Sequence, residues 1–184
     1  IRNLNIVSSE KIQLLYDPVI DIKKIKQKKI HNEKLINFDN KKYFLAAGRL
    51  TKQKNFLFLC KAFKEVIQKY PDLNLLIAGD GEEKNLIQNY FNKNNLQKKI
   101  FLIGYVENIY YYLRNSDGFI LSSLWEDPGF VLVEAAFSRT PIFSSDCKNG
   151  PKELIQENHN GILFNSNNID NFKIKFEKFL KVNH

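Results

Sequence analysis

Residues 43–81 read YFLAAGRLTKQKNFLFLCKAFKEVIQKYPDLNLLIAGDG and contain one complete strand–helix–strand unit. Residues 43–48 form a continuous apolar run that ends at a glycine, which is typical of a strand buried on both faces of a parallel sheet. Residues 55–70 space their apolar side chains like one face of a helix, and Pro71 closes that helix. Residues 73–78 repeat the pattern of a buried strand. This stretch therefore predicts a βαβ unit.

The same alternation of strands and helices continues to the end of the chain. The further predicted strands are 100–103, 118–121, 141–144 and 161–164, and the further predicted helices are 82–96, 109–114, 130–137, 151–155 and 169–180. This order predicts an α/β fold, a Rossmann-like open parallel sheet of about six strands with helices on both faces. Ligands of such sheets bind at the carboxyl ends of the strands, near the point where the strand order reverses.

The amino-acid composition limits the kinds of binding partner that we expect for this chain. The 184 residues fit one domain, with 43% hydrophobic residues and a net charge of +8. The lysines do not alternate regularly with aromatic residues, so we expect no nucleic-acid partner. Solvated surface lysines explain the positive charge, which also permits peripheral contact with an anionic membrane. No apolar run approaches the ~18 residues of a membrane-spanning helix.

The cysteines and histidines suggest neither a metal site nor a redox site. Cys60 and Cys147 lie far apart, outside any metal-binding or redox spacing, which suits a reduced, cytoplasmic setting. His31, His159 and His184 share no spacing typical of a metal site or a catalytic triad. We therefore expect no bound metal.

The loop after the first predicted strand suits a diphosphate. Gly48 at the strand-to-helix turn lets the backbone approach a ligand closely, and helix N-termini attract anions. Arg49 and Lys54 flank this turn, and an arginine can bind two phosphate oxygens at once. A loop with solvated cations is the alternative interpretation. The loop lacks the further glycines of the dinucleotide fingerprint and the Walker pattern, which argues against NAD and ATP hydrolysis.

The most specific segment is residues 126–136, EDPGFVLVEAA, where two glutamates are separated by a loop that opens a helix. Glu126 is expected in the loop after a strand, and Glu134 about one turn into the helix. The amides of Gly129, Phe130 and Val131 would point at a bound anion. Carboxylates beside an anion site can accept hydrogen bonds from sugar hydroxyls. A phosphorylated and polyhydroxylated ligand, such as a nucleotide sugar, fits this segment.

Several motifs together resemble the group 1, or family 4, glycosyltransferases. In chain order they are Ala47-Gly48-Arg49-Leu50 with Lys54, Ala78-Gly79-Asp80-Gly81, Gly104-Tyr105-Val106, Glu126 to Ala136, Thr140-Pro141, Ser144-Ser145-Asp146 and Gly150-Pro151-Lys152-Glu153. The block with seven residues between its two glutamates is the most specific of them.

The resemblance implies a GT-B architecture, in which two Rossmann-like domains enclose the active site. Residues 41–184 would be the C-terminal, nucleotide-sugar-binding domain, and residues 1–40 a linker or hinge segment from an N-terminal acceptor domain. The chain begins without Met and carries no motif of the acceptor domain. We therefore expect a fragment that binds the donor but does not catalyse transfer alone, since positioning and water exclusion need the whole cleft.

The resemblance also implies a role for each candidate residue. Arg49 and Lys54 would bind the donor diphosphate and offset the charge on the leaving group. Glu126 would contact the donor sugar, and Glu134 would hold the ribose hydroxyls. The remaining implied donor-binding residues are Gly48, Gly79 and Gly81. Tyr105 and Val106 would lie near the base, and Gly129, Phe130 and Val131 around the sugar and phosphate.

The implied reaction is transfer of a hexosyl group from a UDP-sugar or GDP-sugar, with retention of configuration and without metal. A saccharide or lipid-linked acceptor would bind through the N-terminal domain, in bacterial lipopolysaccharide or surface-polysaccharide synthesis. The enzyme would lie in the cytoplasm or at the inner face of the plasma membrane.

Two departures from the family pattern are Pro128, where an aromatic residue is usual, and residues 137–139. A non-catalytic nucleotide-sugar-binding module on the same fold is the alternative, since a fold does not fix a function.

Overall fold

The computed structural model describes residues 42–127 and 129–182 of the chain. Within them the strands are β1 (Phe44–Ala47), β2 (Leu75–Ala78), β3 (Ile100–Gly104), β4 (Gly118–Leu121), β5 (Ile142–Ser145) and β6 (Gly161–Phe164). The helices are α2 (Phe56–Lys69), α3 (Lys84–Asn94), α4 (Ile109–Arg114), α5 (Phe130–Phe137), α6 (Pro151–Leu154) and α7 (Ile169–Val182). The predicted alternation from residue 43 onward is confirmed, and the element ends differ from the predicted ones by only a few residues.

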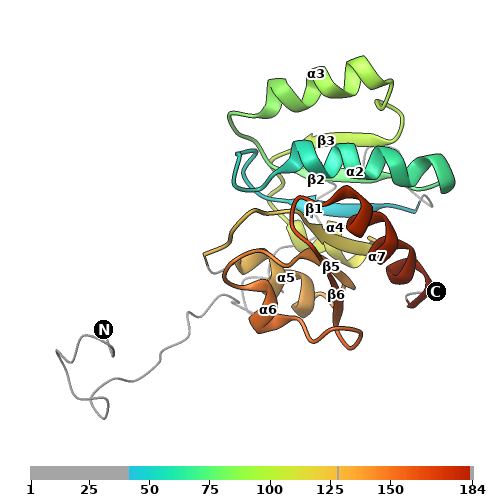
Figure 1. The fold of residues 1–184 in the computed structure, drawn as a ribbon. Coiled ribbons are helices and arrows are strands. Elements are labelled where there is room, and N and C mark those ends of the chain that lie inside the picture. Colours follow the sequence, from blue (N-terminus) through green and yellow to red (C-terminus); the bar gives the residue numbers. More distant parts are fainter. Residues whose placement is uncertain (1–41, 128, 183–184) are drawn as a thin grey trace, which may run out of the picture.

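The strands form one six-stranded sheet in the order β3-β2-β1-β4-β5-β6, and every pairing is parallel (Figure 1). The predicted Rossmann-like parallel sheet is therefore confirmed. From β1 the chain first builds outward through β2 to β3, and then crosses back to place β4 on the other side of β1. The strand order reverses between β1 and β4, so the loops that leave these two strands diverge and leave room for a ligand.

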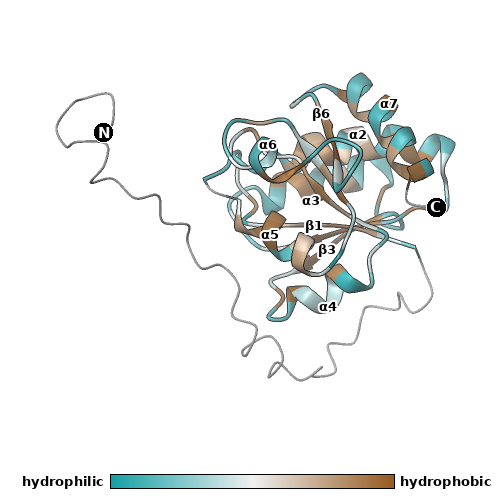
Figure 2. Cartoon of the chain, turned by 90° about the horizontal axis from the view of Figure 1, so that it is seen from below, coloured by the Kyte–Doolittle hydropathy of each residue, from teal (hydrophilic) through white to brown (hydrophobic). Residues whose placement is uncertain are grey.

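Helices cover both faces of the sheet, as predicted. One buried apolar cluster joins the sheet to α2, α3 and α7, and the other joins it to α4 and α5. In Figure 2 these two groups of helices lie on opposite sides of the apolar strands. The inner strands β1, β2, β4 and β5 are buried along their whole length. Continuous apolar runs rather than alternating ones were expected for such strands.

Phenylalanines dominate the cluster on the α7 side. The helical spacing of α7 brings Phe172, Phe176 and Phe179 onto one buried face. Their rings meet Phe143 of β5 at centroid distances of 5.0, 5.2 and 5.3 Å. Phe176 also packs edge to face against Phe44 of β1, at 5.0 Å. Large apolar area and offset ring contacts together stabilise the last helix on the sheet.

Some expectations fall outside the described residues. These are the linker at 1–40 and the proline at position 128. No helix in the described part of the chain is long and apolar enough to cross a membrane.

Phe176→Ala is expected to lower the free energy of unfolding by about 3–5 kcal/mol, because it leaves a cavity among close-packed rings. The control is Ile174→Ala on the same helix. Ile174 is 69% exposed, so its truncation is expected to change stability by no more than about 0.5 kcal/mol. Urea denaturation measures both variants, and similar losses would contradict the proposed packing.

The pairing of α7 with the loop before β6 is expected to weaken in acid. Burial favours a higher pKa for Glu157, but hydrogen bonds from Lys175 Nζ and the Leu163 amide, both 2.8 Å, outweigh it and lower the pKa below its usual value. A carboxylate with a lowered folded-state pKa stabilises the fold above its unfolded pKa, and this contribution is lost as the pH falls through the folded value. Between about pH 6 and pH 3, the wild type should therefore lose more stability than Glu157→Gln. Parallel loss in both proteins would argue against this contribution.

Candidate functional site

The loops after β1 and β4 are joined where the strand order reverses. The Leu124 amide donates to the Gln53 carbonyl at 2.8 Å, and the Ser122 hydroxyl donates to the Lys54 carbonyl at 2.7 Å. The Gln53 side chain donates to the Trp125 carbonyl at 2.9 Å. These bonds hold together two loops that are about 70 residues apart in the chain, and the joined loops form the floor of the site.

An ion pair between Lys54 and Glu126 spans the same two loops. Lys54 Nζ lies 2.7 Å from Glu126 Oε1 and 2.8 Å from Oε2. Glu126 is only 2% exposed, and a carboxylate this deeply buried requires a charged partner or several hydrogen bonds. The Ser123 hydroxyl supplies a further hydrogen bond to Oε1. The two side chains that the sequence assigned to phosphate and sugar are thus in direct contact.

A cavity of about 610 Å³ opens at the carboxyl ends of the strands. This volume lies within the range of roughly 300–1,000 Å³ that is typical of small-molecule sites. Its walls come from the loops after β1, β2, β3 and β4 and from the first turns of α4 and α5. The residues are Ala47, Gly48, Arg49, Lys54, Ala78, Gly79, Asp80, Tyr105, Val106, Glu107, Ile109, Tyr110, Glu126, Asp127, Gly129, Phe130, Val131 and Glu134.

Every residue that the sequence nominated lines this cavity except Gly81. A Cβ atom at Gly81 would lie 2.6 Å from the Leu50 carbonyl oxygen and 2.7 Å from the Leu50 nitrogen. Gly81 therefore lets the loop after β2 pack against the loop after β1. Gly79 has a similar constraint, since a Cβ atom there would lie 1.9 Å from the Gly48 carbonyl oxygen. Both glycines shape the wall of the site, and only Gly79 borders the cavity.

Tyr110 is a lining residue that sequence reasoning missed. Its hydroxyl donates to Glu134 Oε1 at 3.4 Å, and its ring packs against Phe137 of the same helix as Glu134. Burial and the neighbouring Glu134 carboxylate raise the pKa of Tyr110, so it stays a hydrogen-bond donor at neutral pH. The sequence predicted a short helix at 109–114 and gave no role to Tyr110. Asp80, Glu107, Ile109 and Asp127 also line the cavity, although the sequence assigned none of them a binding role.

The charges of the cavity favour hydroxyl binding at some positions and phosphate binding at others. Five carboxylates line it, namely Asp80, Glu107, Glu126, Asp127 and Glu134, against two cations, Arg49 and Lys54. The backbone at Gly129, Phe130 and Val131 contributes the amino end of α5, whose first amides have no partner inside the helix. Tyr105 is 81% exposed and offers an aromatic face at the rim.

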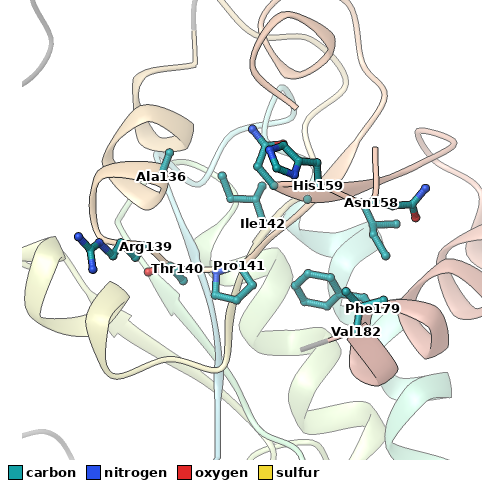
Figure 3. A pocket seen from close by; sticks show the side chains of 12 residues that line it. Ala136, Arg139, Thr140, Pro141, Ile142, Asn158, His159, Phe179 and Val182 are labelled. Atoms are coloured by element: carbon teal, nitrogen blue, oxygen red, sulfur yellow. The ribbon is translucent and has the colours of Figure 1, made fainter. Parts of the chain in front are cut away.

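A second, smaller cavity of about 300 Å³ lies at the other end of the strands from the first (Figure 3). Pro141, Ile142 and Phe179 lie together along it, near the amino ends of β5 and β6. Arg139, Asn158 and His159 supply its polar groups. It shares no residue with the larger cavity and lies away from the carboxyl ends of the strands.

The described residues contain no group of three or more His, Cys, Asp or Glu side chains arranged to hold a metal ion. Independence from metal stays a prediction. Cys60 and Cys147 are both buried free thiols. Burial is the main cause that raises the pKa of each, so neither is an activated nucleophile.

A doubly wound parallel sheet with a cavity at its switch point defines a Rossmann-like α/β domain. The sequence profile described as glycosyl transferases group 1 matches residues 27–183. The chain therefore belongs to the group 1 glycosyltransferase family.

Individual relatives agree with this family. An uncharacterized glycosyltransferase from Methanocaldococcus jannaschii is 45% identical over 112 residues, which cover 61% of this chain and 28% of that protein. The Escherichia coli UDP-Gal:alpha-D-GlcNAc-diphosphoundecaprenol alpha-1,3-galactosyltransferase is 36% identical over 144 residues, which cover 76% of this chain and 37% of that protein. The chain thus spans only about a third of the length of these curated relatives.

Solved structures agree with the fold. A mutant of S. aureus TarM, in complex with fondaparinux, alpha-GlcNAc-glycerol and UDP, superposes with a TM-score of 0.73 and 27% identity, covering 78% of this chain and 29% of that one. The C-terminal domain of a group 1 glycosyl transferase family protein (LpcC) from Francisella tularensis superposes with a TM-score of 0.69. At 21% identity it shares the fold, and the match covers 78% of this chain and 79% of that domain.

Lys54→Met is expected to lower the free energy of unfolding by on the order of 3 kcal/mol, because it leaves the buried Glu126 carboxylate without its cation. Lys84→Met is the control. It breaks an ion pair with Asp80 whose side chains are 49% and 58% exposed, and such pairs contribute little to stability. Urea denaturation compares the two variants. An equal effect would mean that the Lys54–Glu126 contact is no stronger than a surface pair.

Proposed function

We propose that this chain is the donor-binding, C-terminal domain of a family 4 glycosyltransferase with a GT-B architecture. The complete enzyme would transfer a hexosyl group from a UDP-sugar or GDP-sugar to a saccharide or lipid-linked acceptor, with retention of configuration. The observation that carries the proposal is the meeting of Arg49, Lys54, Glu126 and Glu134 around one cavity at the switch point of the sheet.

The chemistry of the cavity supports one orientation of the donor. Arg49 and Lys54 lie on the loop after β1, where they can bind the diphosphate and offset charge on the departing nucleotide. Glu134 lies in α5 with Tyr110 beside it, and its carboxylate suits the two hydroxyls of a ribose. Tyr105 and Val106 would then border the base, and Gly129, Phe130 and Val131 the sugar and phosphate.

The names of related proteins support the substrate classes. The E. coli relative is named for UDP-galactose and an undecaprenol-linked acceptor, and the TarM mutant was crystallised in complex with UDP. A second relative, from Campylobacter jejuni, is 30% identical over 162 residues, covers 88% of this chain and 42% of that protein, and is also named for a diphospho-undecaprenol acceptor. These names favour a role in bacterial surface-polysaccharide or lipopolysaccharide synthesis. Peripheral contact with the inner face of the plasma membrane would suit lipid-linked acceptors and the positive charge of the chain.

Residues 1–40 are proposed to connect this domain to an acceptor-binding domain. That domain would complete the cleft, supply acceptor contacts and exclude water. We expect donor binding by the present chain, without metal, and no sugar transfer until the partner domain is supplied.

Calorimetric titration with UDP, GDP and ADP, each alone and as its sugar conjugate and without metal, tests the donor site. One base is expected to bind saturably, and Arg49→Ala should weaken both the nucleotide and its sugar conjugate by roughly tenfold, because a charge-assisted contact to the diphosphate is lost. Glu134→Ala should also weaken both, since the ribose is common to the two ligands.

The control is Arg114→Ala, an exposed arginine at the far end of α4. It should bind like the wild type. If no nucleotide binds to the folded protein, or if Arg49→Ala and Arg114→Ala behave alike, the proposed donor site is wrong.

A further inference from the structure

Ser123 is a fully buried residue just beyond the end of β4, and it contacts the carboxylate of Glu126. Its hydroxyl donates to Glu126 Oε1, three residues further along the loop. Ser123 does not border the cavity, so it cannot touch a ligand there. Any effect that it has on a ligand must pass through Glu126.

The hydrogen bonds of the Glu126 carboxylate leave one oxygen with spare capacity. An ionised carboxylate offers about four acceptor positions, two on each oxygen. Oε1 accepts from Ser123 and from Lys54, whereas Oε2 accepts from Lys54 alone. Of the two carboxylate oxygens, Oε2 is the nearer to the lining residue Gly129, 3.6 Å from where a Cβ atom there would stand, with Glu126 Cβ and Cγ at 3.4 Å. The free acceptor position of Glu126 is therefore on the oxygen next to the cavity wall.

Ser123 is itself held by two more serines. The Ser145 hydroxyl, at the end of β5, donates to the Ser123 carbonyl at 2.7 Å, and the Ser166 hydroxyl, after β6, donates to it at 3.3 Å. Ser123 and Ser145 are both 0% exposed. These two bonds hold the Ser123 backbone against the ends of β5 and β6, and the bond to Glu126 sets the direction of the Ser123 hydroxyl.

Lys54 alone would not fix Glu126 once a donor is present. The ammonium group has three N–H donors, and two point at Glu126. A bound diphosphate competes for the same cation, because its charge attracts Lys54 toward the cavity. The Ser123 hydroxyl has no such competitor, since it is buried away from the cavity.

We infer that Ser123 is a positioning residue, which holds Glu126 Oε1 so that Oε2 accepts a hydroxyl of the donor sugar while Lys54 turns toward the diphosphate. The inference rests on the proposed donor site and adds a residue that selects for the sugar rather than for the nucleotide. Ser145 holds the Ser123 carbonyl, so its hydroxyl also contributes to sugar selectivity, but less than that of Ser123.

The test compares the affinity of one protein for a nucleotide and for its sugar conjugates. We expect wild-type protein to bind UDP-glucose, UDP-galactose, UDP-N-acetylglucosamine or GDP-mannose more tightly than the matching UDP or GDP. Ser123→Ala should reduce affinity for the preferred sugar conjugate by roughly tenfold, the loss expected for one hydrogen bond to a charged group. Its affinity for the free nucleotide should stay within about twofold, since no nucleotide contact changes.

Ser144→Ala is the matched control, because Ser144 is an equally buried serine on β5 whose hydroxyl bonds only to the adjacent Ser145 carbonyl. It should leave both affinities as in the wild type. Ser123→Thr keeps the hydroxyl and should recover sugar selectivity, and Ser145→Ala should lose a smaller part of it. Thermal melts accompany each titration, so that binding is compared only between folded proteins.

Three results would overturn the inference. Ser123→Ala could lower the affinity for the nucleotide and for its sugar conjugate equally, which would indicate a purely structural role. Ser123→Ala could also leave both affinities unchanged, or Ser144→Ala could reduce sugar-conjugate affinity as much as Ser123→Ala does. In each case the wild type still binds nucleotide and the donor site stands. Wild-type protein that binds no nucleotide and no conjugate would overturn the donor site together with this inference.

Discussion

The reversal of strand order between β1 and β4 is the constraint on which the site depends. Parallel strands direct their carboxyl ends to one edge, and the crossover from β3 to β4 separates the loops that leave the two central strands. The Lys54–Glu126 ion pair bridges that gap with contacts of 2.7 and 2.8 Å. Without the Phe-rich packing of α2 and α7 beneath the sheet, these loops would have no fixed distance between them.

The ion pair also balances the charge in the floor of the cavity. A buried carboxylate and a partly buried ammonium group neutralise each other, so the cavity is formed without an uncompensated charge in its floor. Lys54 is paired with Glu126, whereas Arg49 is an exposed cation of the same cavity. The exposed Arg49 and the paired Lys54 are therefore two cations of the cavity in different electrostatic environments.

The acidic lining distinguishes this cavity from a simple phosphate pocket. Its carboxylates outnumber its cations, which would oppose binding of inorganic phosphate through like-charge repulsion. The same carboxylates are good acceptors for ribose and hexose hydroxyls. A ligand that combines a short anionic segment with hydroxyl groups on either side of it matches this arrangement, and nucleotide sugars have that form.

The sequence by itself determined the elements of the fold and most of the lining of the cavity. Apolar runs, helical spacing and glycines at strand ends are local signals, and they predicted every strand and helix from residue 43 onward. The motif residues followed because they lie directly after strands, where a parallel sheet must gather them. Tertiary structure alone decided which of these residues touch. Lys54 and Glu126 are 72 positions apart, Gly81 packs against Leu50 rather than the cavity, and the roles of Ser123 and Tyr110 arise from contacts that no local pattern records. Contacts of this kind depend on strand order and on the depth of each loop, which the chain acquires only when the sheet is assembled.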